Sequence, residues 1–134
     1  MKRKQIILLT LAATLLSACG SLGADSLTGK SWKLITIGDS SPVAGSTLTL
    51  AFESGQASGH SGCNSFGGTY QVNGNELQFE QMMSTLMACA NQSLMEQEST
   101  YMKFLGDANH FEFVDGQLHI YRPDGDALIF VPVE

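Results

Sequence analysis

The feature that most constrains the fold is a series of short segments in which apolar and polar residues alternate, separated by turn-forming dipeptides. Residues 47–52 alternate strictly, which places Leu48, Leu50 and Phe52 on one face. Asn73-Gly74 and Asp115-Gly116 each separate two such segments, and both dipeptides favour a tight β-hairpin because their residues tolerate positive φ. The pattern predicts antiparallel strands at 31–35, 47–52, 56–60, 69–72, 76–80, 110–114, 117–121 and 127–131, with 82–88 as a further strand.

One segment changes to the period of a helix. Ser93 and Glu96 match a capping box, and the apolar residues that follow repeat at helical spacing, with Glu98 on the solvent side and an end before Gly106. The apolar positions are Leu94, Tyr101, Phe104 and Leu105. We therefore expect an α+β fold: a strongly curved, mainly antiparallel sheet, or a cracked barrel, with one α-helix packed against it.

The N-terminal residues read as an export signal. Lys2, Arg3 and Lys4 precede an apolar run at 6–16 that is too short for a permanent membrane span. Leu-Ser-Ala directly before Cys19 resembles the bacterial lipobox, whose cysteine becomes an acylated N-terminus, so Cys19 is the expected lipid attachment residue. We divide the chain into a signal peptide at 1–18, a small polar tether at 19–26 and a domain at 27–134. The alternative is an ordinary signal peptide with an incidental cysteine at its cleavage site.

The charge balance excludes some partners. The chain has seven Lys and Arg against 13 Asp and Glu, a net charge of −6. Three of the cations lie in residues 2–4, so the chain from residue 19 onward carries four cations against 13 anions, or −9. This acidity argues against nucleic acid as a partner and against membrane binding through the domain's own side chains. Membrane attachment would come from the acyl chains, since two or more give stable anchoring. By resemblance, Gly20 after the lipidated cysteine favours the outer membrane, facing the periplasm.

Two cysteines remain once Cys19 is assigned to lipid. In an exported domain of this size, Cys63 and Cys89 are expected to form a disulfide. Two free buried thiols are one alternative, and a redox or metal site that includes His60 is another. The metal reading lacks a fourth ligand in the sequence, so we expect neither a metal nor another cofactor.

Five of the six methionines fall within 21 residues, and they leave two interpretations open. Met82, Met83, Met87, Met95 and Met102 could pack adaptably in the core between a strand and the helix. They could instead line a groove for acyl tails or for a hydrophobic partner segment.

An ordered set of motifs resembles the META domain family, the family of the heat-shock lipoprotein HslJ. The motifs are Leu-Thr-Gly-Lys-Ser-Trp at 27–32, Gly-Cys-Asn-Ser-Phe-Gly-Gly-Thr-Tyr at 62–70 and Thr-Leu-Met-Ala-Cys at 85–89, followed by a helical glutamate, Glu96 or Glu98. Ser65 departs from the pattern, since arginine is common there. On this resemblance the motif residues expected to matter, besides the cysteines, are Gly62, Asn64, Phe66, Gly68, Tyr70, Thr85 and Met87.

The resemblance also implies a function. It implies an α/β fold with a curved sheet and a cell-envelope lipoprotein linked to stress and novobiocin resistance. The residues show no catalytic constellation, so we expect a non-enzymatic protein that acts by binding an envelope protein or a hydrophobic ligand. The alternative is a carrier or pilot-type protein for acyl chains, by analogy with the cracked barrels of type III secretion pilot lipoproteins.

Overall fold

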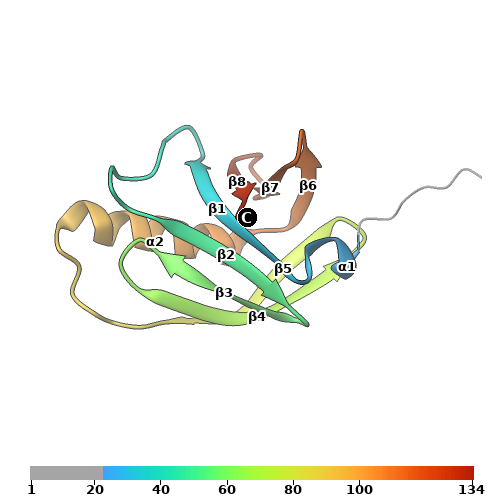
Figure 1. The fold of residues 1–134 in the computed structure, drawn as a ribbon, viewed down its shortest axis with the longest axis horizontal. Coiled ribbons are helices and arrows are strands. Elements are labelled where there is room, and N and C mark those ends of the chain that lie inside the picture. Colours follow the sequence, from blue (N-terminus) through green and yellow to red (C-terminus); the bar gives the residue numbers. More distant parts are fainter. Residues whose placement is uncertain (1–22) are drawn as a thin grey trace, which may run out of the picture.

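The computed structural model describes residues 23–134, so the predicted signal peptide and Cys19 lie outside the described residues. This part of the chain contains two helices and eight strands (Figure 1). In chain order they are α1 Ala24–Leu27, β1 Lys30–Ile37, β2 Leu48–Glu53, β3 Gln56–Ser61, β4 Ser65–Asn73, β5 Glu76–Ser84, α2 Gln92–Asp107, β6 His110–Val114, β7 Gln117–Tyr121 and β8 Ala127–Pro132.

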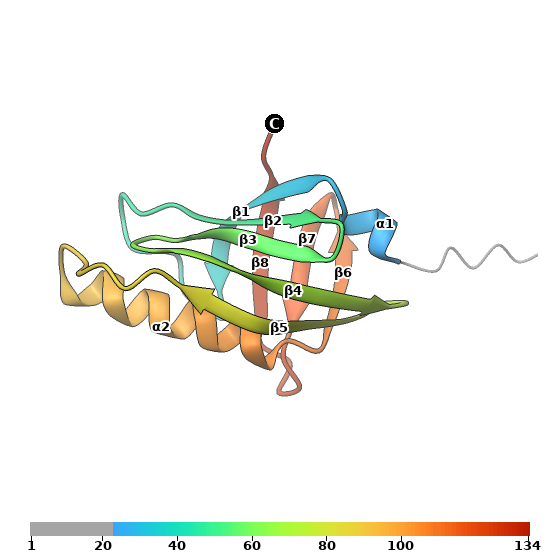
Figure 2. The ribbon, with the colours of Figure 1, turned by 90° about the horizontal axis from the view of Figure 1, so that it is seen from below.

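The eight strands form a closed antiparallel barrel in which each strand pairs with the next along the chain and β8 pairs with β1. The expected curved antiparallel sheet with one packed helix is confirmed, but the sheet closes where we had allowed for a crack. The narrowest pairing joins β5 and β6, whose ladder consists of Glu76 opposite His110. The chain between these two strands forms α2, which runs along the barrel beside them (Figure 2).

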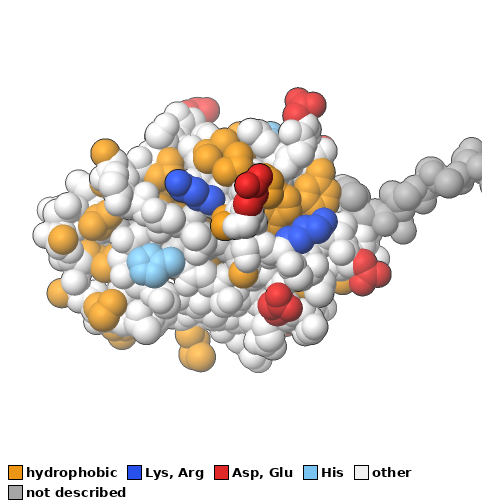
Figure 3. Space-filling model, in the orientation of Figure 1, with side chains coloured by type: hydrophobic (Ala, Val, Ile, Leu, Met, Phe, Trp, Pro, Cys, Tyr) orange, Lys and Arg blue, Asp and Glu red, His pale blue; other side chains and the backbone are white. Residues whose placement is uncertain are grey.

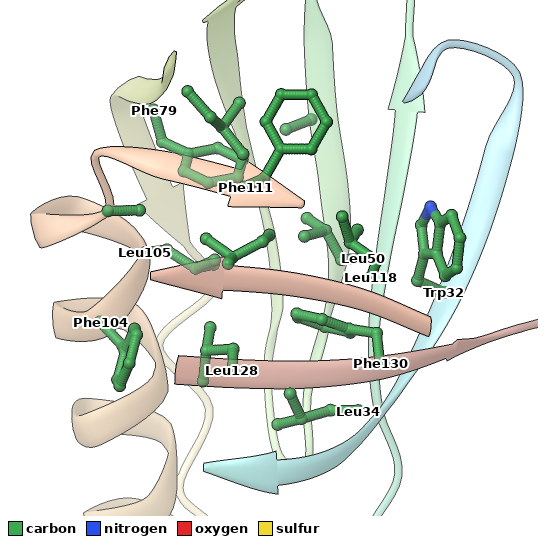
Figure 4. Close-up of a cluster of buried hydrophobic side chains, with 14 of the residues drawn as sticks. Trp32, Leu34, Leu50, Phe79, Phe104, Leu105, Phe111, Leu118, Leu128 and Phe130 are labelled. Atoms are coloured by element: carbon green, nitrogen blue, oxygen red, sulfur yellow. The ribbon is translucent and has the colours of Figure 1, made fainter. Parts of the chain in front are cut away.

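The barrel interior is filled with large apolar side chains. Alternate residues of each strand point inward, as in β2, where Leu48, Leu50 and Phe52 are buried as predicted. Helix α2 adds Tyr101, Phe104 and Leu105. Figure 4 shows Phe111, Phe130 and leucines of several strands converging on the same interior. Each buried Leu or Phe contributes roughly 1.5–3 kcal/mol of transfer free energy, so this packed interior is the main source of stability.

Three local predictions were wrong. Strand β5 ends at Ser84, and the expected strand at 82–88 gives way to a loop. The N-cap of α2 is Asn91, whose side chain accepts a hydrogen bond from the Leu94 amide at 3.0 Å, so Ser93 lies within the first turn. The helix also continues through Gly106 to Asp107. Residues 24–26 of the expected tether, together with Leu27, form the short helix α1.

Among the described residues, neither helix is long and apolar enough to cross a membrane.

Candidate functional site

The expected disulfide is present. Cys63 lies in the turn between β3 and β4, and Cys89 lies in the loop between β5 and α2. Their Cα atoms are 5.6 Å apart, within the usual range for a disulfide. The bond therefore fastens the β5–α2 loop to the turn that carries the most distinctive motif of the sequence.

Asn64, the next residue, is the centre of a buried hydrogen-bond network. Its side chain is only 2% exposed. Its Oδ1 accepts from the Met87 amide at 2.8 Å and from the Thr85 hydroxyl at 2.9 Å. Its Nδ2 donates to Glu98 Oε1 at 2.9 Å and to the Met87 carbonyl at 3.3 Å. One side chain thus fixes the β5–α2 loop at two residues and connects it to α2.

Glu98 is the acidic residue of this network, and its position corrects the sequence prediction. It was expected on the solvent side of the helix, but it is half-buried and faces the β3–β4 turn. Its Oε2 accepts from the Ser61 hydroxyl at 2.7 Å and from the Asn64 amide at 3.0 Å. Of the two glutamates considered for the helical position of the motif, Glu98 contacts the other motif residues, whereas Glu96 pairs with Gln92.

Two glycines of the motif, Gly62 and Gly68, lie where a side chain does not fit. Gly62 has φ +94°, and a Cβ there would lie 2.7 Å from Gln97 Nε2. Gly68 sits where the register of β4 against β5 shifts, and a Cβ would approach Met82 Sδ to 2.5 Å. Gly62 therefore allows close packing of the turn against α2, and Gly68 allows close packing of β4 against β5.

The two aromatic motif residues belong to the core. Phe66 packs edge-on against Tyr101 of α2, with ring centroids 5.6 Å apart. Tyr70 packs edge-on against Phe52, and its hydroxyl lies 2.9 Å from Thr28 Oγ1. These contacts attach β4 to α2 at one end and to the start of the domain at the other.

Sequence reasoning missed Gln97, which fixes the long β1–β2 connection to α2. The side chain is buried; its Oε1 accepts from the Val43 amide at 2.6 Å, and its Nε2 donates to Ser46 Oγ at 3.1 Å. Gln97 lies three residues after Leu94 and four before Tyr101, so helical spacing places it on their face. This spacing in the sequence could have indicated that Gln97 is buried.

The network has little capacity for chemistry. The sulfurs of Cys63 and Cys89 and a carboxylate oxygen of Glu98 lie within 4.8 Å of one another. Zinc and similar metals bind the thiolate, and here both sulfurs are consumed by the disulfide. Ser61, beside Glu98, is fully buried, so a substrate cannot reach its hydroxyl. Most polar groups of the network bond to one another, so Asn64 organises the loop through side-chain-to-backbone hydrogen bonds.

A second polar cluster lies on β6 and β7. The Tyr121 hydroxyl donates to Glu112 and lies 3.3 Å from His119 Nδ1. The hydrogen bond to Glu112, with smaller effects of burial and of the Glu112 charge, raises the pKa of Tyr121 to about 12. Because a higher pKa disfavours the phenolate, the environment makes Tyr121 a poorer nucleophile and base.

The surface beside the disulfide is apolar. Among the clustered methionines, Met82 and Met102 pack against the core, as one interpretation predicted. The others are exposed: Met83 by 75%, Met87 by 63% and Met95 by 55%, with Leu86 exposed by 94% between them. Met83 lies apart on β5, opposite Gly67, and we call the other three residues, Leu86, Met87 and Met95, the methionine surface. Figure 3 shows orange side chains along the end of the molecule where α2 begins.

The comparison with known families agrees with the motif pattern. The model of the META domain matches residues 25–134. The chain belongs to the META domain family. The Cys63–Asn64 turn, the Thr85–Cys89 segment and Glu98 lie within the matched residues, and the fold brings them together in space although they are far apart in sequence.

Solved structures share the architecture of this META domain. An NMR structure of a protein from Burkholderia xenovorans is 26% identical over 82% of this chain and 86% of that chain, with a TM-score of 0.66. A second NMR structure is 21% identical over 82% and 94% of the two chains, with a TM-score of 0.68. A DUF4847 family protein from Bacteroides vulgatus is 12% identical over 80% and 94%, with a TM-score of 0.57. The last two show a common fold alone. No curated protein matches the chain.

Proposed function

We propose that this META-domain protein is a non-enzymatic lipoprotein of the cell envelope that acts by binding. In this proposal acyl chains on Cys19 anchor it, in the outer membrane facing the periplasm. The export signal, the lipobox and the net charge of −9 from residue 19 onward support this assignment. Its role is envelope integrity or tolerance of stress and antibiotics, which the family resemblance suggests.

The observation that carries the binding role is the contrast between the motif network and the surface beside it. The hydrogen-bonding groups of Asn64 are used inside the fold, together with those of Glu98 and Thr85. The loop that they hold exposes Leu86 and Met87 to solvent. A rigidly held apolar surface is characteristic of a binding site, whereas a hydrogen-bond network without an accessible nucleophile is a structural element.

The alternative role, a carrier that shelters acyl chains, fits the packing less well. A lipid tail inside the barrel would need the space that Phe52, Phe111 and Phe130 occupy. All three are fully buried in the interior, so an acyl chain could enter only by displacing core side chains.

Two experiments test the proposal. The anchoring part predicts that wild-type protein incorporates labelled fatty acid and sediments with membranes, and that Cys19→Ala abolishes both. Labelling that persists in Cys19→Ala would refute acylation at this residue. For the functional part, we expect deletion of the gene to increase sensitivity to novobiocin, and wild-type protein to restore tolerance. Equal tolerance with and without the gene would refute this role.

A further inference from the structure

The methionine surface is a preformed feature of the fold. Exposed apolar loops usually fold inward or move, but this loop is fixed at three residues. The Met87 amide and carbonyl both bond to the Asn64 side chain, the disulfide holds Cys89, and Asn91 caps α2. Leu86 and Met87 are therefore held in solvent although they are apolar, an arrangement that suits a contact surface.

Within the described residues, the strands β2–β5 and the beginning of α2, which carry this surface, have no Lys or Arg. These elements belong to the span between Lys33 and Lys103. Of the six carboxylates in the same span, the exposed one next to Met95 is Glu96, while Glu98 belongs to the motif network and Glu53 and Glu76 lie in the β2–β3 and β4–β5 hairpins. On the face shown in Figure 3, the Lys and Arg side chains lie away from the end where α2 begins. A partner with cations beside its apolar residues would complement this region electrostatically.

A groove lined by both apolar and polar residues lies next to Met95. It runs along α2 beside the β5–α2 loop and is lined by Cys89, Gln92, Met95, Glu96 and Thr100 among others. Methionine side chains adapt to the shape of their partners because they are unbranched and polarizable. The lining combines the apolar side chain of Met95 with the carboxylate of Glu96, and an amphipathic basic helix can contact both kinds of group at once.

The position of the chain start argues against the anchoring membrane as the occupant. Helix α1 and the beginning of α2 lie at opposite ends of the long axis (Figure 1). Cys19 precedes Ala24 by five residues, which span at most about 18 Å when fully extended. On the proposed acylation of Cys19, the methionine surface therefore lies at the opposite end of the domain from α1, the element next to the anchored residue.

We propose that the methionine surface binds a basic amphipathic helix of another envelope protein. This inference rests on the proposed binding function and names the surface and the class of partner. The apolar face of the helix would cover Leu86 and Met87 and lie along Met95. Its Lys or Arg residues would approach Glu96, whose side chain is exposed at the edge of the groove.

The test uses defined synthetic peptides as probes. The protein is the mature chain with Cys19→Ala, which retains the whole barrel and its core and has no acyl chain to compete. The probes are two peptides of equal length that form amphipathic helices, one of Leu and Lys and one of Leu and Glu. Binding is measured by calorimetry at low and at physiological salt.

We expect the Leu/Lys peptide to bind and the Leu/Glu peptide to bind at least tenfold more weakly. The double variant Leu86→Ser with Met87→Ser should weaken binding of the Leu/Lys peptide at least tenfold, and Glu96→Lys severalfold. The matched controls are Ile35→Ser and Val133→Ser, which replace exposed apolar residues elsewhere and should leave binding unchanged. Circular dichroism confirms that each variant is folded.

Two results would overturn the inference: equal affinity for both peptides, or unchanged affinity in the Leu86 and Met87 double variant. Neither would affect the membrane anchoring of the wild-type protein or its role in tolerance, which the Cys19→Ala and deletion experiments measure separately.

Discussion

Asn64 allows the sharpest test of how the motif network stabilises the fold. Replacing it by Ala removes two hydrogen bonds accepted by Oδ1 and the bond that Nδ2 donates to the Glu98 carboxylate. A neutral hydrogen bond contributes about 1 kcal/mol and one to a charged group about 2 kcal/mol, which totals about 4 kcal/mol. Thr85 and Met87 are exposed, so water replaces part of what they lose. We expect Asn64→Ala to lower the free energy of unfolding by about 3 kcal/mol.

Chemical denaturation of the mature chain measures this loss directly. For a domain of this size, 1 kcal/mol corresponds to roughly 4 °C in Tm, so Tm should fall by about 12 °C. The control is Ser65→Ala, because the neighbouring Ser65 is exposed and only its backbone bonds to the loop; its effect should stay below about 0.5 kcal/mol. If the two variants were equally stable, the network would not stabilise the fold as described.

The substitution Asn64→Asp separates charge from hydrogen bonding. It places a carboxylate oxygen where Nδ2 now lies, 2.9 Å from Glu98 Oε1. Two ionised carboxylates at that distance repel each other strongly. We expect the loss of stability to exceed that of Asn64→Ala at neutral pH and to diminish as the pH falls and one carboxyl becomes protonated. A loss that is independent of pH would refute the proposed contact with Glu98.

Three further predictions concern other parts of the barrel. Gly59→Ala should lower the free energy of unfolding by more than about 3 kcal/mol, because its Cβ would lie 2.0 Å from a backbone carbonyl of the neighbouring strand. Gly106→Ala, in open space on α2, should instead raise the free energy of unfolding by about 0.5–1 kcal/mol. Similar thermal melts for the two variants would contradict this packing. Cys89→Ser should lower the free energy of unfolding, measured with denaturant, by about 3.5 kcal/mol, because the disulfide joins residues separated by 26 positions. Titratable thiols in the unreduced wild-type domain would contradict the bond. Because the folded pKa of Tyr121 is raised to about 12, its contribution to stability is complete below the unfolded pKa of about 10 and is lost as pH rises through about 12. Glu112→Ala should move that tyrosine's ultraviolet titration toward pH 10, and an unchanged curve would exclude Glu112 as the cause.

Much of the barrel could be predicted because strand geometry is local. Successive side chains of a strand point to opposite faces, so the alternation of Leu48, Leu50 and Phe52 identified β2 and its buried face. The hairpin dipeptides marked the turns in the same way. Closure of the barrel was harder to predict from the sequence, because the pairing of β5 with β6 depends on the direction in which α2 leads the chain between them.

The candidate site shows the limit of such reasoning. The resemblance identified the motif residues, but the helical pattern predicted that the Glu98 side chain faces solvent, whereas it faces the β3–β4 turn. Its partner Asn64 lies 34 residues earlier, and no local sequence pattern indicates a contact between residues so far apart. The strand predicted at 82–88 failed for the same reason, since the Asn64 side chain takes the Met87 backbone groups that a ladder would have used.

The amino-acid sequence alone determined the elements that depend on neighbouring residues: the strands, the hairpin turns and the existence of one amphipathic helix. It also reduced the disulfide to one possible pair once Cys19 was assigned to lipid. The tertiary structure decided which residues become inaccessible and which stay in solvent. Asn64 and Gln97 are polar yet buried, and Leu86 and Met87 are apolar yet exposed. Gln97 is buried because it bonds the β1–β2 connection to α2. Asn64 is buried because it bonds the β5–α2 loop, and these bonds together with the disulfide hold Leu86 and Met87 in solvent despite their hydrophobicity.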